Sequence, residues 1–335
     1  MTWLAWRLFR AQGYLALALL ACLAVVAVAT GPHLASLYAE SGSTACTGDR
    51  CSALAQSFLN DAKSGLTGAF YTVGMLAVIG VPILAGVFWG APLVSRELEA
   101  GTYRVAWTQS VTRTRWLLPR LGLVLGAAAV TAGLASLALT WWASPIDSAQ
   151  GGRLQPGVYL ARGIVPVGYA LLAVAVGVLL GAVMRRTVPA MATTFAVVAG
   201  VMLTFSLWLR PHLVPPVHSN VPLDLRDIQT FAETNGGHME VVVNFAQKGA
   251  LVLSNRTLTP EGKLFVGPAD PTQCSRDLPG QQCMDWVGSL GLRQDVTYQP
   301  ASRFWDFQLV ETGILVVLAA AAVALSVWWV RRRLS

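Results

Sequence analysis

Six long stretches without a single Asp, Glu, Lys or Arg residue constrain the fold of this chain more than any other feature. A helix of about 20 residues crosses the roughly 30 Å of a bilayer's hydrocarbon, and each stretch is about that length or longer. Only 12% of the residues are charged, about half the fraction typical of a soluble domain. We therefore predict an all-α polytopic membrane protein with six transmembrane helices, at Ala11–Ala39, Ser64–Ser95, Leu121–Ile146, Gly163–Met184, Thr187–Leu209 and Thr312–Val330.

The first span has two interpretations. Arg7 and Arg10, then an apolar stretch, then small residues at 27–29 are typical of a cleavable signal peptide. The apolar core at 13–29 is long for that purpose, and aromatic residues beside the two arginines favour an interfacial segment. We favour an interfacial helix that leads into a retained span, and cleavage stays the alternative.

Basic residues next to the span ends predict the orientation. With both termini in the cytoplasm, the inner segments hold twelve basic and two acidic residues, and the outer segments hold twelve basic and 15 acidic residues. This bias predicts a multi-pass protein of the cell (plasma) membrane with both termini cytoplasmic. The basic balance then reflects topology, so we expect the lipid bilayer as a partner and no nucleic acid.

One sizeable soluble segment remains between spans 5 and 6, and we expect it to form a small α+β extracytoplasmic domain. Its apolar runs at 239–245 and 249–255 predict two strands joined by a short turn that contains Gln247 and Lys248. The predicted organisation is a cytoplasmic interfacial helix at 1–12, transmembrane spans 1–5 at 13–209 with a cytoplasmic coupling loop at 93–120, the extracytoplasmic domain at 210–305, and span 6 with a cytoplasmic tail at 306–335.

The cysteines support this topology. Cys22 falls inside span 1, where we expect a small apolar side chain packed within the protein. The other four fall on the predicted outer side, and an even number of thiols on the oxidising side indicates disulfides. Four cysteines permit three pairings, of which the short spacings favour Cys46–Cys51 and Cys274–Cys283. A metal site is less favoured, because no histidine lies beside either pair.

The spans lack the residues of ion-driven transporters. Such proteins usually bury Asp, Glu, His or Lys within the membrane, whereas Arg162 and Glu311 are expected at the outer rims, where they reach water. A proton-coupled mechanism is therefore disfavoured. The sequence also contains no ATP-binding P-loop, no GxSxG elbow and no HExxH motif, so we expect neither an enzyme active site nor a metal site.

The segment SRELEAGTYRVAWTQSVTRTRW, 95–116, gathers charge between two uncharged spans. Pro92 can begin a helical extension of span 2 through Glu99, and Gly101 is suited to end it in the left-handed conformation. Thr102 can then cap a second short helix over 103–110. The arginines alone are explained by topology, but the two glutamates and the Gly-Thr pair are not.

This segment resembles the cytoplasmic loop of type-2 ABC exporter permeases, in particular an actinobacterial branch. The run YQPASRFWDFQLVETG, 298–313, resembles the approach to the last span in the same branch. The resemblance implies that two permease copies, as a homodimer, or this chain and a relative pair with two separate ABC ATP-binding subunits, which hold the ATP and Mg that this chain lacks. It also implies that the loop docks on those subunits through Arg96, Glu97, Glu99, Gly101, Thr102, Tyr103, Arg104 and Trp107.

The function expected from this resemblance is export of a hydrophobic or amphipathic small molecule, such as a drug or natural product, with multidrug resistance as one outcome. The substrate path is expected along spans 2 and 5, where ordinary packing is the alternative role of each aromatic residue, at Phe70, Tyr71, Phe195, Phe205 and Trp208. The alternative function is a membrane sensor or scaffold whose outer domain binds a ligand. That function needs a cytoplasmic signalling module, and the sequence offers only loops.

Overall fold

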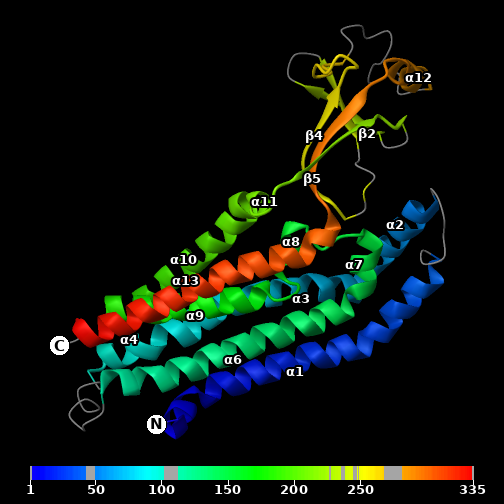
Figure 1. Ribbon diagram of the computed structural model, residues 1–335. Coiled ribbons are helices and arrows are strands. Elements are labelled where there is room, and N and C mark those ends of the chain that lie inside the picture. Colours follow the sequence, from blue (N-terminus) through cyan, green and yellow to red (C-terminus); the bar gives the residue numbers. More distant parts are fainter. Residues whose placement is uncertain are drawn as a thin grey trace. The chain divides into compact units, whose positions relative to one another are not determined.

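The computed structural model describes residues 2–42, 50–101, 112–225, 228–234, 238–243, 247, 249–267 and 281–333. The chain divides into two compact units (Figure 1). Unit 1 comprises Met1–Leu213 and Phe304–Ser335, and unit 2 comprises Val214–Arg303. The sequence predicts the outer domain at 210–305, and unit 2 spans Val214–Arg303. The described part of the chain is mostly helical, with two small antiparallel sheets in unit 2.

Within the described residues, six helices are long and apolar enough to cross a membrane, as predicted. They are Phe9–Glu40, Gly65–Glu99, Arg113–Trp142, Val165–Met184, Thr187–His212 and Ala301–Arg332. The first of them lies within one unbroken helix, so the predicted interfacial segment and first span are continuous. The elements that form them are α1 (Thr2–Glu40), α3 (Gly65–Leu84), η1 (Ala85–Gly90), α4 (Ala91–Glu99), α6 (Arg113–Trp142), α9 (Val165–Met184), α10 (Thr187–Thr204), η2 (Phe205–Leu209), α11 (Arg210–His212) and α13 (Phe304–Arg332). The two η segments are π-helical turns.

Both termini of unit 1 lie at the same end of the helical bundle, together with the end of α4 and the start of α6 (Figure 1). A hydrogen bond from Arg113 Nη1 to the carbonyl oxygen of Arg331, 3.0 Å long, joins the start of α6 to the end of α13. We call this the terminal end of the bundle. The short helices α2 (Arg50–Ala62), α7 (Ser144–Gln150) and α8 (Pro156–Leu160) lie towards the opposite end.

Helix α9 forms the centre of unit 1 and packs against α3, η1, α4, α6, α10 and α13. Its approach to span 2 is close enough to exclude side chains. A Cβ atom on Gly177 would lie 2.5 Å from the carbonyl oxygen of Gly86, and one on Gly181 would lie 2.4 Å from that of Ala91. Small residues let helix backbones meet directly within a membrane, so glycine sets the distance between spans 2 and 4.

The described residues of unit 2 form two antiparallel sheets and a short helix, α12 (Gln281–Ser289). In the larger sheet the strand order is β1-β5-β4, and in the smaller one β2 pairs with β3. Cys283, Val287 and Leu292 form a small buried cluster beside this framework. The strands are β1 (Val217–Pro222), β2 (Ile228–Thr234), β3 (His238–Val243), β4 (Leu251–Leu258) and β5 (Arg293–Gln299), and a 3₁₀ turn, η4 (Ala301–Arg303), follows.

The predicted hairpin between 239–245 and 249–255 is wrong, although strands occupy both places. β3 pairs with β2, and β4 pairs with β5, which lies more than 30 residues later in the chain. β3 and β4 are not paired through their backbones. A side chain of β4 contacts β3 instead: Asn255 Nδ2 donates to the carbonyl oxygen of Val243 at 2.8 Å. Local alternation of apolar residues predicts a strand but does not select its partner.

The structure leaves the predicted cysteine pairing open. Cys51 and Cys283 each take part in a disulfide bond whose partner is not identified. Cys46 and Cys274 lie outside the described residues, so the pairs Cys46–Cys51 and Cys274–Cys283 stay predictions. Cys22 is a free thiol and is exposed. The expectation that it is buried inside the protein is wrong, because its side chain is exposed on the surface of α1.

Replacing Gly181 with alanine should lower the free energy of unfolding by about 1–3 kcal/mol, the usual cost of overpacking. The new methyl carbon would lie 2.4 Å from the Ala91 carbonyl oxygen. The matched control is Gly126→Ala, because no atom lies within 4 Å of a Cβ there and alanine favours helix by about 1 kcal/mol. Unfolding of both variants in one detergent measures the difference, and equal stabilities would contradict the backbone contact.

Candidate functional site

Among the described residues of unit 1, four charged side chains lie almost wholly inside it, towards the end of the bundle opposite its termini. Asp147, Arg162, Arg210 and Glu311 are each 3% exposed or less. They form two ion pairs, Arg162 with Asp147 and Arg210 with Glu311. A buried charge without a partner costs several kcal/mol, so each pair strongly constrains how its helices are placed.

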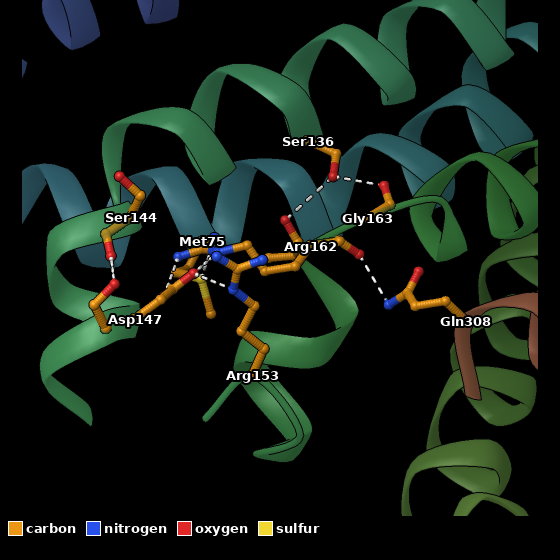
Figure 2. Close-up of polar contacts among 10 residues, drawn as sticks. Met75, Ser136, Ser144, Asp147, Arg153, Arg162, Gly163 and Gln308 are labelled. Atoms are coloured by element: carbon orange, nitrogen blue, oxygen red, sulfur yellow. Dashed lines mark hydrogen bonds and ion pairs between the residues drawn. The ribbon is translucent and has the colours of Figure 1, made fainter. Parts of the chain in front are cut away.

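The first pair joins α7 to the segment between α8 and α9. Arg162 donates from Nε to Asp147 Oδ2 at 3.0 Å and from Nη2 to Asp147 Oδ1 at 3.2 Å. Figure 2 shows the two side chains facing one another, with Met75 beside them, whose sulfur lies 3.4 Å from Arg162 Nη1. Arg153 approaches the same carboxylate at 3.4 Å from a more exposed position. The Asp147 carboxylate therefore pairs with two arginine side chains.

Gln308 of α13 continues this network onto the start of α9 (Figure 2). Its Nε2 donates to the carbonyl oxygen of Arg162 at 3.1 Å, and its Oε1 accepts from the backbone N–H groups of Ile164 and Val165 at 2.8 and 2.9 Å. The first N–H groups of a helix have no partner within the helix. Gln308 satisfies them, so one buried amide caps α9 and fastens α13 to it.

The second pair joins span 5 to span 6. Arg210 donates from Nε to Glu311 Oε2 and from Nη2 to Glu311 Oε1, both at 3.0 Å. Tyr169 of α9 donates its hydroxyl to Glu311 Oε1 at 2.8 Å. The guanidinium also lies 4.0 Å above the ring centre of Tyr159. Burial, and then the Glu311 carboxylate, raise the pKa of the Tyr159 phenol, which therefore stays neutral.

The expectation that Arg162 and Glu311 reach water at the outer rims is wrong, because both are fully buried and paired. Arg210 and Glu311 also lie within candidate spans, so the inference against proton coupling loses its main support. The sequence held a signal that was missed. Asp147 and Arg162, and likewise Arg210 and Glu311, are opposite charges beside span ends on the same predicted side.

The predicted coupling loop is described only in part. Thr102, Tyr103, Arg104 and Trp107 lie outside the described residues, as does the short helix predicted at 103–110. The preceding helix α4 begins with Pro92 in its first turn and ends at Glu99, as predicted. Gly101 follows with a φ of 70°, which confirms the left-handed stop.

The two glutamates of this segment contact other spans of the same chain. Glu97 forms an ion pair with Arg120 of α6, whose guanidinium lies 4.8 Å from the ring centre of Trp116. Glu99 Oε2 accepts from the backbone N–H of Thr187 at 2.9 Å, at the first residue of α10. A carboxylate is favoured at a helix N-terminus. The glutamates therefore fasten the end of α4 to the starts of spans 3 and 5.

The five aromatic residues expected along a substrate path do not form one cluster. Phe70 and Tyr71 pack on Trp142, with ring centres 4.7 and 6.5 Å away. Phe205 is buried against Tyr169 at 6.2 Å. Phe195 and Trp208 are 54% and 74% exposed. Packing is the observed role of the first three, and the last two lie on the surface of span 5.

Within the described ranges, no group of three or more His, Cys, Asp or Glu residues is placed to hold a metal.

Comparison with known proteins gives one match. A family model described as "ABC-2 membrane transporter related" matches residues 17–210, more than half of the chain. No curated protein and no solved structure matches. The matched range includes spans 2 to 5 and the glutamates of α4.

Glu311→Gln should lower the free energy of unfolding by about 3–5 kcal/mol, because it leaves Arg210 buried without a counter-charge. Replacing both partners, by Arg210→Met with Glu311→Leu, should recover most of that loss. Denaturant unfolding of the purified protein measures both. The control is Arg153→Gln, whose side chain is 36% exposed, and it should change stability by at most about 1 kcal/mol. A double variant as unstable as the single one would refute this account.

Proposed function

Because this chain belongs to the ABC-2 membrane transporter related family, we propose that it is the membrane-spanning half of an exporter driven by a separate ATP-hydrolysing subunit. The chain is a membrane component of an ABC transporter. Members of its family are transport components that have no ATPase domain of their own. Membership implies a partnered ABC ATP-binding subunit. ATP and Mg would be held there, and a second permease copy would complete the transport path as a homodimer.

The observation that carries the proposal is the pair of contacts made by the glutamates of α4. Glu97 holds Arg120 at the start of span 3, and Glu99 holds Thr187 N–H at the start of span 5. A force applied to the segment that follows Gly101 would therefore reach three spans at once. A partner that changes conformation on ATP hydrolysis needs such a rigid connection to alternate the bundle between inward- and outward-facing states.

The proposed orientation puts the terminal end of the bundle in the cytoplasm and unit 2 outside the cell. The arginines of α4, α6 and α13 gather at the terminal end, as the positive-inside rule requires of a cytoplasmic face. Cys51 and Cys283 each take part in a disulfide bond, which suits an oxidising outer side for their segments. The protein would thus be a multi-pass protein of the cell membrane.

The proposed cargo is a hydrophobic or amphipathic small molecule, such as a drug or natural product. Span 5 supports this class, because its surface carries the large exposed side chains Phe195 and Trp208. Span 5 also contains the π-helical turn η2, and such turns are frequent at functional sites. Two copies that meet along this face would enclose an apolar, aromatic path.

Coupling predicts a specific phenotype for Glu97→Gln. The permease should still fold and co-purify with its ATP-binding subunit, while ATP-dependent transport by the pair in vesicles falls about tenfold, the effect of about 1.4 kcal/mol of lost coupling. Exchanging the charges, with Glu97→Arg and Arg120→Glu together, should restore part of the transport. Glu261→Gln, in an exposed turn of unit 2, is the control and should transport normally.

Two results would overturn the proposed function. One is full transport by Glu97→Gln and by Glu99→Ala. The other is full transport by the permease in vesicles that contain no ATP-binding subunit.

A further inference from the structure

A cavity of about 170 Å³ lies between the start of α1, the η1–α4 segment and the first turns of α6. Its lining includes residues of α4 and of the first turns of α6, the elements that meet at the terminal end of the bundle. Three elements that are distant in the chain thus contribute its walls. The cavity contains none of the five aromatic residues proposed for the cargo path, although Glu97 and Arg120 of the proposed coupling contact line it.

The walls change from charged to apolar along the helix axes. On the η1–α4 segment, the lining begins with Phe88, which is 49% exposed, and the partly buried Trp89. Arg96 and Glu97 follow eight residues later, about 12 Å nearer the end of the bundle. The facing helix α6 has the same polarity, because Arg120 precedes Leu123 and Val124. The cavity therefore has a charged mouth and an apolar interior.

The mouth carries an excess of one positive charge. Glu97 neutralises Arg120 in an ion pair. Arg96 lines the same mouth, is exposed, and has no ion-pair or hydrogen-bond partner in the described part of the chain. Its guanidinium is thus available for an anion, and arginine binds phosphate through two parallel hydrogen bonds.

The inner wall is held in place by a hydrogen bond between α1 and η1. The carbonyl oxygen of Phe88 lacks its usual helical donor, because the residue four positions later is Pro92, which has no N–H. Gln12 Nε2 donates to this oxygen instead, at 3.1 Å. Phe9, one turn before Gln12, packs edge-on against Trp89 with ring centres 5.1 Å apart. These two contacts fix the positions of Phe88 and Trp89 in the apolar part of the cavity lining.

We propose that this cavity binds an anionic phospholipid, with the phosphate at Arg96 and the first part of an acyl chain against Phe88, Trp89 and Leu123. A volume of about 170 Å³ is below the roughly 300 Å³ of the smallest pockets that enclose a drug-sized ligand. The ligand must therefore continue outside the cavity, and a lipid continues into the surrounding bilayer. Arginines at a membrane surface also attract anionic lipid. The proposal needs only the membrane placement of the bundle, and neither ATP nor the partner subunit.

The test uses the full chain in phosphatidylcholine nanodiscs with a trace of phosphatidylglycerol that carries a photoreactive group in its acyl chain. Cross-links should map by mass spectrometry to peptides that contain Phe88–Leu93 or Leu123–Val124. Arg96→Gln should reduce this labelling at least about tenfold, because it removes the charge-assisted hydrogen bonds to the phosphate. Arg115→Gln is the matched control, because Arg115 is an exposed arginine at the same end of the bundle and outside the cavity lining.

A filling variant, Leu93→Trp, should also abolish the labelling. If Leu93→Trp fails to fold, two comparisons still test the proposal. One compares Arg96→Gln with the unchanged protein, and the other compares the two photoreactive lipids. A photoreactive phosphatidylcholine should label at a small fraction of the phosphatidylglycerol yield. Equal labelling by the two lipids, or by Arg96→Gln and the unchanged protein, would overturn the proposal. Protection by millimolar inorganic phosphate would identify a soluble anion, and not a lipid, as the ligand, and would overturn it as well.

Discussion

A charge buried in hydrocarbon is tolerated only when an opposite charge lies beside it, and the arrangement of the helical unit depends on this constraint. Asp147 accepts two hydrogen bonds from Arg162, and Glu311 accepts two from Arg210. Each pair joins segments that are connected only through loops or a whole second unit. Because neither partner can move away without exposing the other to a large penalty, the two pairs fix the ends of spans 3 to 6.

Glycine supplies the second constraint, at the centre of the bundle. Helix α9 meets the η1–α4 segment backbone to backbone, since Gly177 and Gly181 present no side chain to the carbonyl oxygens of Gly86 and Ala91. A contact of this kind is short-ranged and allows little sliding. Motion of α4 is therefore passed on to α9, and through Gln308 and Tyr169 the helix α9 is fastened to α13.

The two ends of the bundle differ in chemistry, and this difference suits a component that is driven from one side. Towards one end lie the fully buried ion pairs of Arg162 and Arg210. At the terminal end the charges are nearer the surface, and Glu97 and Glu99 each hold a neighbouring span by a single contact. These two contacts join span 2 to spans 3 and 5, so the terminal end is where a force on α4 would reach its neighbouring spans.

The sequence by itself determined the six helices, the helix through Glu99 and the stop at Gly101, because hydropathy and backbone preference belong to each segment alone. Only the tertiary structure decided that β3 pairs with β2, that Arg162 and Glu311 are buried, and that Phe70 and Tyr71 pack on Trp142. These outcomes depend on which faces of distant segments meet. A pattern within one segment carries no information about that, since each ion pair or strand pair is stabilised by both partners together.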